Sequence, residues 1–393
     1  MTRDASSMVV VPFHVEDPAV VIRTLDIAAT HPSVARVVAV AGHHGPTTRA
    51  VLDGIPGKSG RVDLVTQARF GSLRSGKGDA VNTGFHRFLE DTDCERIHFY
   101  DADIKTFGPE WISKAEHALD LGFATVRHYY PRAATDAMIT WMITRPAFAL
   151  LWPDSHLARL HQPLSGELAF TRAAAEVVAG DPLVRGQSDW GVDTAITFAT
   201  VRHGLSIYQS YLSVGKDHAL YGSLLDIKVM MLECLAALQR LRSFPLTRSP
   251  AELHIEDPVA VSSVIAQQIG FDVEATQRVL AGTWTEVQIA LLESYFPGEV
   301  ARAARQWTQW PDTTAMDEDN WMAALRVLLD RFELDDPDWQ ELAFRLWVGR
   351  VLHYTLRVAV RGHGYASGYL SDMVERAIVA AQSPSSRLHR GGR

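Results

Sequence analysis

The sequence contains few cysteines, no excess of positive charge and no long apolar run, and each absence excludes a class of protein. The two cysteines, Cys94 and Cys234, lie far apart without CxxC spacing, so neither a zinc knuckle nor a disulfide framework is indicated. The net charge of -8 argues against broad nucleic-acid binding, which needs a concentrated basic surface. The longest apolar stretches, such as residues 229–238, are too short to span a bilayer.

What remains is the composition of a globular protein. The chain has 393 residues, of which 47% are hydrophobic and 21% are charged, and this length suffices for about two to three domains. The polar N-terminal residues MTRDASS lack the apolar stretch of a signal peptide. We therefore expect a cytoplasmic protein with reduced cysteines and with neither a nucleic-acid nor a membrane partner.

Strand-like and helical patterns alternate over residues 8–125. Strands are predicted at 8–13, 34–42, 61–67 and 96–103, and helices at 17–31, 47–55, 79–92 and 109–122. This alternation predicts an α/β fold with a mostly parallel sheet covered by helices, in which ligands bind beyond the carboxyl ends of the strands.

The pattern changes at about residue 224, because from there apolar residues recur at helical spacing. A helical region is therefore predicted, joined to the sheet through the proline-containing stretch 245–258. We expect an α/β domain over 8–223, a helical domain over 224–382 and a flexible tail over 383–393. The apolar faces of the helical domain favour a homo-oligomer.

An acidic pair, Asp101 and Asp103, follows the apolar run RIHFY and precedes a helix start at Pro109. In an extended segment, residues i and i+2 project to the same side. Two carboxylates held together repel unless a cation lies between them or one is protonated, so the pair is a candidate site for a hard divalent ion. The alternative is a solvated loop whose aspartates accept hydrogen bonds from backbone N–H groups.

A glycine-rich stretch, GSLRSGKGDAVNTGF, occupies residues 71–85. Gly71 to Lys77 fits the G-x4-G-K spacing of a phosphate-binding P-loop, but Gly78 stands where that motif needs a hydroxyl for magnesium. Arg74, Lys77 and free backbone N–H groups at the following helix start would still favour a phosphate. An ordinary mobile loop is the alternative.

Two later stretches carry acidic and imidazole side chains that suit a binding site. SDWGVDTAITF, residues 188–198, contains Asp189 and Asp193, and GKDHALYG contains His218 after the strand-like LSIYQSYLSV. A lone histidine is more often structural than a metal ligand, so His218 is a weaker candidate than the acidic pair.

The stretch RHYYPRAATDAMITWMITRP, residues 127–146, places charged residues among aromatic and small ones. Arg132 is a candidate for binding a planar carboxylate through two parallel hydrogen bonds. Asp136 and Thr140 lie four residues apart, so on a helix they would share a face. The alternative is a helix with one surface ion pair.

Taken together, these stretches resemble a known family. GT-A glycosyltransferases, which have a Rossmann-like nucleotide-diphospho-sugar transferase fold, combine a DxD motif with a preceding segment such as GKGDAVNTG, a later DWGVD aspartate and a distal metal-binding histidine. RIHFYDADIKTFGPEWISKAE, VRHYYPRAATDAMITWMITR and SDWGVDT resemble the mannosylglycerate synthase family of retaining GT-A enzymes more closely. The resemblance runs from about Val9 to Tyr365 and rests on long strings rather than on one short motif.

The resemblance implies donor and metal roles at particular positions. Asp103 and His218 would ligate a divalent metal, Mg²⁺ or Mn²⁺, and Asp101 would contact the ion or the sugar nucleotide. Leu164 and Asp193 would face the transferred sugar. The residues that would line the donor nucleotide and its diphosphate are Pro12, Phe13, Glu16, Gln67, Lys77, Asp101 and Ala102.

The resemblance also implies an acceptor site. Arg132 would hold the acceptor carboxylate, and Tyr221 would close over the acceptor. The residues that would surround the acceptor are Arg132, Asp136, Ala137, Met138, Ile139, Thr140 and Tyr221. The residues that would take part directly in catalysis are Lys77, Asp101 and Asp193.

The implied reaction is the transfer of mannose from GDP-mannose to D-glycerate with retention at the anomeric carbon, which yields a compatible solute. UDP-glucose or GDP-glucose as donor, and lactate or glycolate as acceptor, remain open, because no local motif recognises guanine. Two positions depart from the family pattern. His14 stands where lysine is expected, which affects one donor contact, and Ser165 replaces a glycine, which would crowd the sugar site.

Three other functions fit parts of the sequence. An aspartyl-nucleophile phosphatase also has a DxD after a strand, but usually near its N-terminus and followed by a small residue or threonine, whereas Ile104 and Lys105 follow here. A nucleotidyltransferase needs a glycine-rich loop after the first strand, where PFHVEDP stands. A non-catalytic scaffold that binds a sugar nucleotide need not keep metal, phosphate and carboxylate candidates together.

Overall fold

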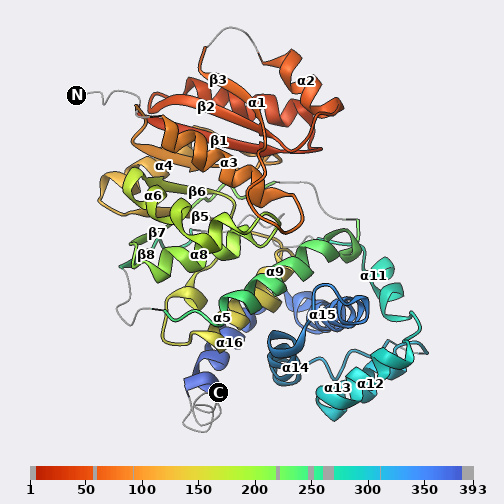
Figure 1. Cartoon of the computed structure of the whole chain (residues 1–393). Helices are drawn as coiled ribbons and strands as arrows, with labels where there is room; N and C mark the ends of the chain where they lie inside the picture. Colours follow the sequence, from red (N-terminus) through yellow and green to blue (C-terminus); the bar gives the residue numbers. More distant parts are fainter. Residues whose placement is uncertain are drawn as a thin grey trace. The chain divides into compact units, whose positions relative to one another are not determined.

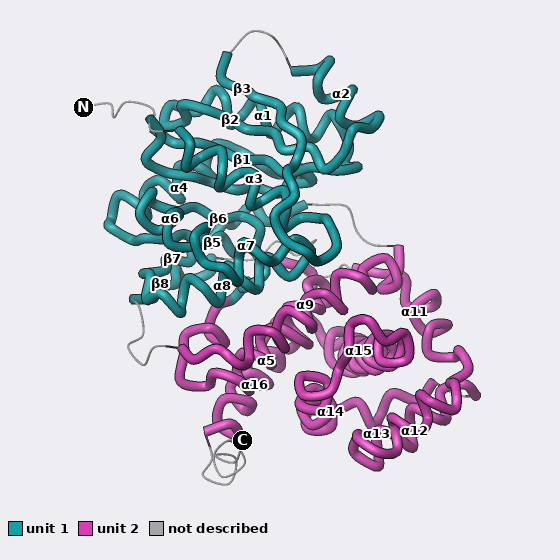
Figure 2. The backbone as a smooth tube through the Cα atoms, in the orientation of Figure 1, with its two compact units in different colours: residues 1–131, 161–219, 249–260 teal, residues 132–160, 220–248, 261–393 magenta. Residues whose placement is uncertain are grey.

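The computed structural model describes residues 6–55, 60–91, 93–217, 222–246, 252–259, 270–309 and 311–382. The chain divides into two compact units, each assembled from separate stretches of the sequence (Figure 2). The first unit comprises residues 1–131, 161–219 and 249–260, and the second comprises 132–160, 220–248 and 261–393. Among the helices of the described residues, none has both the length and the apolarity that crossing a membrane requires.

An eight-stranded sheet forms the first unit (Figure 1). Its strand order is β3-β2-β1-β4-β6-β5-β7-β8. The strands are β1 (Ser7–Phe13), β2 (Val34–Ala41), β3 (Val62–Thr66), β4 (Arg96–Phe99), β5 (Thr125–Tyr129), β6 (Leu168–Thr171), β7 (Ile207–Tyr211) and β8 (Leu253–Ile255). Strand β6 runs antiparallel to β4 and β5, and the other neighbours are parallel. The predicted mostly parallel sheet is therefore confirmed.

Helices cover both faces of the sheet. They are α1 (Pro18–Thr30), α2 (Pro46–Gly54), α3 (Lys77–Glu90), α4 (Pro109–Asp120), α6 (Arg172–Gly180), α7 (Pro182–Arg185) and α8 (Val192–Arg202). Strand β1 is buried on both faces: Val10 packs in the core that contains Phe85 of α3, and Val11 packs in the core that contains Trp111 of α4. Such two-sided burial explains its continuous apolar sequence.

Local signals set the starts of these helices. The side chain of Asp17 accepts a hydrogen bond from the Ala19 N–H at 2.9 Å, and Pro18 opens α1. Pro109 likewise opens α4, with Glu110 in its first turn. The predicted helices at 17–31 and 109–122 are thus confirmed within a few residues at each end.

The second unit is helical, as predicted. Its helices are η1 (Thr140–Thr144), α5 (Arg145–Leu151), η2 (Leu157–Arg159), η3 (Leu224–Ile227), α9 (Lys228–Leu241), α11 (Val273–Leu280), α12 (Glu286–Tyr295), α13 (Gly298–Gln306), α14 (Glu318–Arg331), α15 (Pro337–Arg357), η4 (Ala359–Arg361) and α16 (His363–Gln382). Residues 132–160 belong to this unit although they precede β6 in sequence. A domain boundary at 223/224 stays a prediction.

A buried ion cluster joins α4 to the sheet. The carboxylate of Glu116 accepts hydrogen bonds from Ser7 Oγ at 2.5 Å and from Arg96, and its Oε1 lies 2.8 Å from Nε2 of His98. Burial alone would raise the pKa of Glu116, but the hydrogen bonds from His98 and Ser7 and the charge of Arg96 lower it to about 2. The fold therefore favours the ionised form of this carboxyl group.

We predict that Glu116→Gln lowers the free energy of unfolding at pH 7 by about 2 to 4 kcal/mol, because the buried guanidinium group of Arg96 then has only the half-exposed Asp120 as its carboxylate partner. Since the folded pKa lies below the ordinary 4.5, the carboxylate stabilises the fold above pH 4.5, and this contribution disappears as the pH falls to about 2. Urea unfolding over this pH range should show that the free energy of unfolding falls less with decreasing pH in the variant than in the wild type.

Glu110→Gln is the matched control, because Glu110 is exposed in the first turn of the same helix. We expect it to change the free energy of unfolding by less than about 0.5 kcal/mol. Equal effects of the two substitutions would contradict the role assigned to the buried cluster.

Candidate active site

The acidic pair lies in a turn and not in a strand. Strand β4 ends at Phe99, and Asp101 to Asp103 belong to the turn that follows. The predicted strand over 96–103 was therefore too long, and the argument that i and i+2 project to one side of an extended segment does not apply. Ala102 between them is 2% exposed and packs in the core that contains Trp111, whereas 25% of the Asp101 side chain and 37% of the Asp103 side chain are exposed.

Lys77 joins two of the predicted site residues. Its Nζ lies 2.9 Å from Oδ1 of Asp101 and 3.0 Å from Oδ2 of Asp193. Lys77 is the first residue of α3 and Asp193 lies in the first turn of α8, so the two helices and the turn after β4 meet at this ammonium group. The structure thus brings together the three residues that the sequence singled out for catalysis.

A second lysine, not predicted from the sequence, completes this cluster. Nζ of Lys216 lies 2.8 Å from Oδ2 of Asp101, 2.8 Å from Oε1 of Glu167 and 3.7 Å from Oδ1 of Asp103. Glu167 immediately precedes β6, and because β6 is antiparallel its start meets the carboxyl ends of β4 and β5. Lys216 stands in the GKDHALYG stretch, two residues before the candidate metal ligand His218. This position is the only feature of the sequence that could have indicated a place for Lys216 in the site.

Burial and charge pairing fix the ionisation of these groups. Burial alone would lower the pKa of Lys77, but the charges of Asp101 and Asp193 raise it above its ordinary value. The pKa of Lys216 is likewise raised, by the charges of Asp101 and Glu167. Burial alone would raise the pKa of Asp101, and the two lysines hold it well below its usual range. Burial raises the pKa of Asp193 to about 6, although Lys77 opposes this shift.

Two backbone N–H groups in the first turn of α3, those of Gly78 and Asp79, already have acceptors within the protein. The N–H of Gly78 donates to the Asp189 carbonyl at 3.2 Å, and the N–H of Asp79 donates to the Ser188 carbonyl at 3.1 Å. A Cβ at position 78 would lie 2.0 Å from the Gln187 carbonyl oxygen, so glycine is required for this close approach. These two N–H groups are therefore not free for a phosphate, and the side chains of Arg74 and Lys77 stay the predicted cationic contacts.

A second glycine makes room for the Lys77–Asp101 pair. A Cβ at Gly166 would lie 2.3 Å from Oδ1 of Asp101 and 2.6 Å from Nζ of Lys77. The preceding Ser165, 2% exposed, has its hydroxyl oxygen 2.7 Å from Oε2 of Glu167 and 3.1 Å from the carbonyl oxygen of His128. The Ser165 hydroxyl, which the family pattern lacks because it has glycine at this position, is thus held by hydrogen bonds to its neighbours.

The predicted nucleotide-lining residues lie where strands end. Pro12 and Phe13 close β1, and Glu16 follows it, with its carboxylate accepting from the His14 N–H at 2.5 Å. Gln67 follows β3 and its side chain donates to Ser75 Oγ at 3.1 Å. These positions fit the rule that ligands of such sheets bind beyond the carboxyl ends of the strands, and their nucleotide contacts stay predictions. Leu164, the predicted sugar-facing residue, is half-buried two residues before Gly166.

The predicted acceptor residues from 132 to 140 belong to the second unit. Arg132 and Asp136 form an ion pair at 2.8 Å, with 20% and 14% of their side chains exposed. Asp136 lies before the helical segment, so the expectation that it shares a helix face with Thr140 was wrong. Its carboxylate instead accepts from the Ala137 N–H at 2.6 Å.

This segment is held in an unusual conformation. Ala137 has a φ of 57°, a left-handed value that L residues rarely adopt, and Thr140 opens a π-helix. The Ala134 carbonyl accepts from the hydroxyl of Tyr354 at 2.7 Å, and Thr135 Oγ1 accepts from the Gly270 N–H at 2.9 Å. Such conformations persist where the surrounding structure fixes them, and they occur preferentially at ligand sites. Met138 and Ile139 are buried in the following turn.

Two predicted residues, His218 and Tyr221, lie outside the described residues. The proposed pairing of His218 with Asp103 at a metal is therefore untested. Within the residues that the structure describes, no three or more His, Cys, Asp or Glu side chains are arranged to hold a metal.

The donor atoms around the acidic turn nevertheless suit a hard divalent cation. The cluster contains four carboxylates and two ammonium groups, so negative charge is in excess when all are ionised. Both oxygens of Asp101 are engaged by lysines, whereas Asp103 is 37% exposed and its contact with Lys216, at 3.7 Å, is longer than a hydrogen bond. Asp103 is therefore the more available oxygen ligand.

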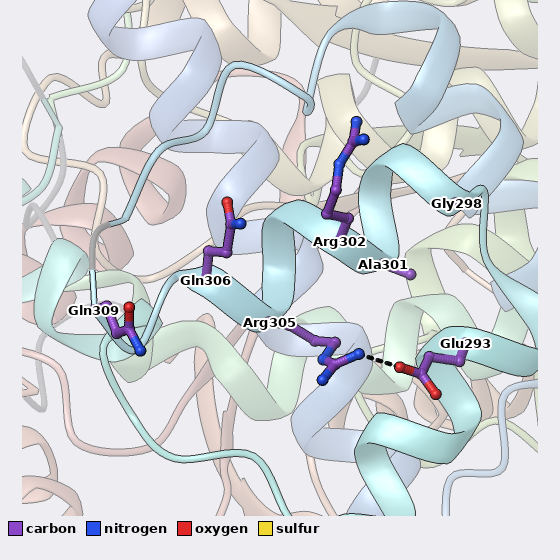
Figure 3. Close-up of a pocket in the computed structure, with 7 residues that line it drawn as sticks. All are labelled: Glu293, Gly298, Ala301, Arg302, Arg305, Gln306 and Gln309. Atoms are coloured by element: carbon purple, nitrogen blue, oxygen red, sulfur yellow. Dashed lines mark hydrogen bonds and ion pairs between the residues drawn. The ribbon is translucent and has the colours of Figure 1, made fainter.

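A separate cavity of about 470 Å³ lies in the second unit, between α12 and α13 (Figure 3). Its lining residues are Glu293, Gly298, Ala301, Arg302, Arg305, Gln306 and Gln309. Arg305 and Glu293 form an ion pair across it. No residue predicted for the site belongs to this cavity.

The chain is similar to known proteins over nearly its whole length. Residues 7–240 match the model of the mannosylglycerate synthase GT domain, and residues 265–374 match that of the mannosylglycerate synthase C-terminal domain. The chain is 47% identical over 387 residues to the mannosylglycerate synthase of Rhodothermus marinus, covering 98% of this chain and 97% of that protein. It is 44% identical over 394 residues to that of Selaginella moellendorffii, covering 98% and 93%.

Solved structures support the fold. Glucosyl-3-phosphoglycerate synthase from Mycobacterium tuberculosis, crystallised with Mn²⁺, UDP-glucose and phosphoglyceric acid, is similar over 61% of this chain and 81% of its own, with a TM-score of 0.50 and 21% identity. The same protein has been crystallised with Mg²⁺ and UDP. By its two matched domains and its identity to full-length relatives, the chain belongs to the mannosylglycerate synthase family of glycosyltransferases.

Proposed function

We propose that this glycosyltransferase moves mannose from GDP-mannose to D-glycerate, with retention at the anomeric carbon and with the help of Mg²⁺ or Mn²⁺. The observation that carries the proposal is the placement of the Lys77 ammonium group between Asp101 and Asp193, at 2.9 and 3.0 Å. The names of the full-length relatives support the choice of sugar and acceptor.

Cleavage of the sugar–phosphate bond leaves a nucleoside diphosphate that gains negative charge. Lys77 faces that charge with a fixed ammonium group, because both of its carboxylate partners are anchored in helices or turns of the first unit. Asp103 and His218 would hold the divalent cation, which supplies Lewis-acid stabilisation of the same charge. Asp193 orients hydroxyls of the transferred sugar.

Arg132 binds the acceptor carboxylate in this scheme. Its ion pair with Asp136, at 2.8 Å, holds the guanidinium group in place. A guanidinium group can bind a planar carboxylate through two parallel hydrogen bonds. We favour attack on the same face from which the phosphate leaves, because the departing phosphate oxygen can then accept the proton of the acceptor hydroxyl and no separate base is needed. A covalent glycosyl-enzyme intermediate is the alternative route to retention.

The direct test incubates the protein with Mn²⁺, one of GDP-mannose, GDP-glucose or UDP-glucose, and one of D-glycerate, lactate or glycolate. We expect rapid release of GDP only when GDP-mannose and D-glycerate are present together, with slow hydrolysis of GDP-mannose alone, and we expect NMR of the product to show the α-anomeric configuration of the donor. Asp103→Ala should abolish the transfer.

Other outcomes of the same panel would overturn the proposal. Turnover with a glucose donor alone would assign a different sugar, and phosphate release from phosphomonoesters alone would assign a phosphatase. Binding of the sugar nucleotide without turnover would assign a scaffold.

We predict that Arg132→Ala raises the KM for D-glycerate about 100-fold, because charge-assisted hydrogen bonds to the carboxylate are lost. Slow hydrolysis of the donor should continue at its original rate, since the substitution leaves the donor residues intact. Steady-state kinetics with varied glycerate, and GDP release without glycerate, measure the two effects.

Arg376→Ala is the control for this prediction. Arg376 of α16 also lies in the second unit and forms an ion pair, with Glu318 of α14, but it is not among the predicted acceptor residues. Its KM for glycerate should equal that of the wild type. An unchanged KM in Arg132→Ala would remove Arg132 from the acceptor site.

A further inference from the structure

Glu167 is a fully buried carboxylate whose role the reaction scheme leaves open. Its side chain is 0% exposed, and Oε1 lies 2.8 Å from Nζ of Lys216. Its other oxygen, Oε2, accepts from Ser165 Oγ at 2.7 Å and from the hydroxyl of Tyr130 at 3.1 Å. Both oxygens are therefore engaged, and the carboxylate is fixed from two sides.

The ammonium group of Lys216 stands between this fixed carboxylate and the acidic turn. It lies at hydrogen-bonding distance from Glu167 and from Asp101, both at 2.8 Å, but 3.7 Å from Oδ1 of Asp103. Without Glu167, the only carboxylates left near the Lys216 ammonium group would be those of the acidic turn, Asp101 and Asp103. A cation closer to Asp103 would oppose a divalent ion at that carboxylate, since like charges repel strongly at a few ångströms in a partly buried site.

We propose that Glu167 is a positioning residue that holds Lys216 away from Asp103 and thereby sets the affinity of the acidic turn for a divalent cation. The inference rests on the metal dependence of the proposed function. It assigns Glu167 an action through Lys216 and no contact with the ion or with substrate.

The test measures the binding of Mn²⁺ alone, without sugar nucleotide, by electron paramagnetic resonance of the free ion. Lys216→Met removes the opposing charge and should tighten Mn²⁺ binding about tenfold. Glu167→Gln keeps the shape but releases Lys216 toward Asp103, and should weaken Mn²⁺ binding about tenfold. Two substitutions of one ion pair are thus expected to shift the dissociation constant in opposite directions.

The double variant separates positioning from direct action. If Glu167 acts through Lys216, Glu167→Gln should change the Mn²⁺ dissociation constant by less than about threefold when Lys216→Met is already present. Equal weakening in both backgrounds would show that Glu167 itself attracts the ion, and would overturn the inference. The neutral double variant also avoids an unpaired buried charge, so it provides a folded protein if a single variant is unstable.

Glu256→Gln is a matched control. Its carboxylate also accepts from a lysine and a tyrosine, Lys114 at 2.8 Å and Tyr208 at 2.9 Å, but at the β8 edge of the sheet. We expect Mn²⁺ affinity and transfer activity to remain those of the wild type in this variant.

The outcomes keep this inference apart from the proposed function. Equal Mn²⁺ affinity in all variants, or no Mn²⁺ binding by a wild type that transfers mannose, would overturn the role of Glu167 and leave the reaction standing. Opposite shifts in a protein that does not use GDP-mannose would support the role of Glu167 and overturn the proposed donor.

Discussion

The site depends on one buried balance of charge, in which Asp101 lies between the ammonium groups of Lys77 and Lys216. This carboxylate follows β4, while the two lysines open α3 and follow β7, so a single anion joins three segments that are distant in sequence. Removing one member of such a buried ion pair is costly, because it leaves its partner's charge uncompensated. The antiparallel course of β6 is what allows Glu167 to reach the same edge of the sheet.

Much of the fold could be predicted because its signals are local. Strand β1 is continuous in apolar residues since both of its faces are covered, and an Asp-Pro or Gly-Pro pair marks the helix starts at Pro18 and Pro109. The candidate site could be predicted in part for a different reason. Lys77, Asp101 and Asp193 stand in long strings that resemble one family, and the structure brings these three side chains together.

The remainder depends on tertiary contacts that no local pattern records. Strand β6 has only four residues and pairs antiparallel with its neighbours, so alternation did not reveal it. The N–H groups of Gly78 and Asp79 at the start of α3 donate to carbonyls of residues 189 and 188, more than 100 positions away, and so are not free for phosphate. Glu167 and Lys216 could not be predicted for the same reason, since only the tertiary fold brings them together with Asp101.

A crystal structure grown with Mn²⁺ and GDP would show whether the charged edge of the sheet binds a cation and a diphosphate. We expect the ion on Asp103, the diphosphate within hydrogen-bonding distance of Lys77, and Lys216 still paired with Glu167. An ion bound elsewhere, or a diphosphate distant from Lys77, would contradict this account.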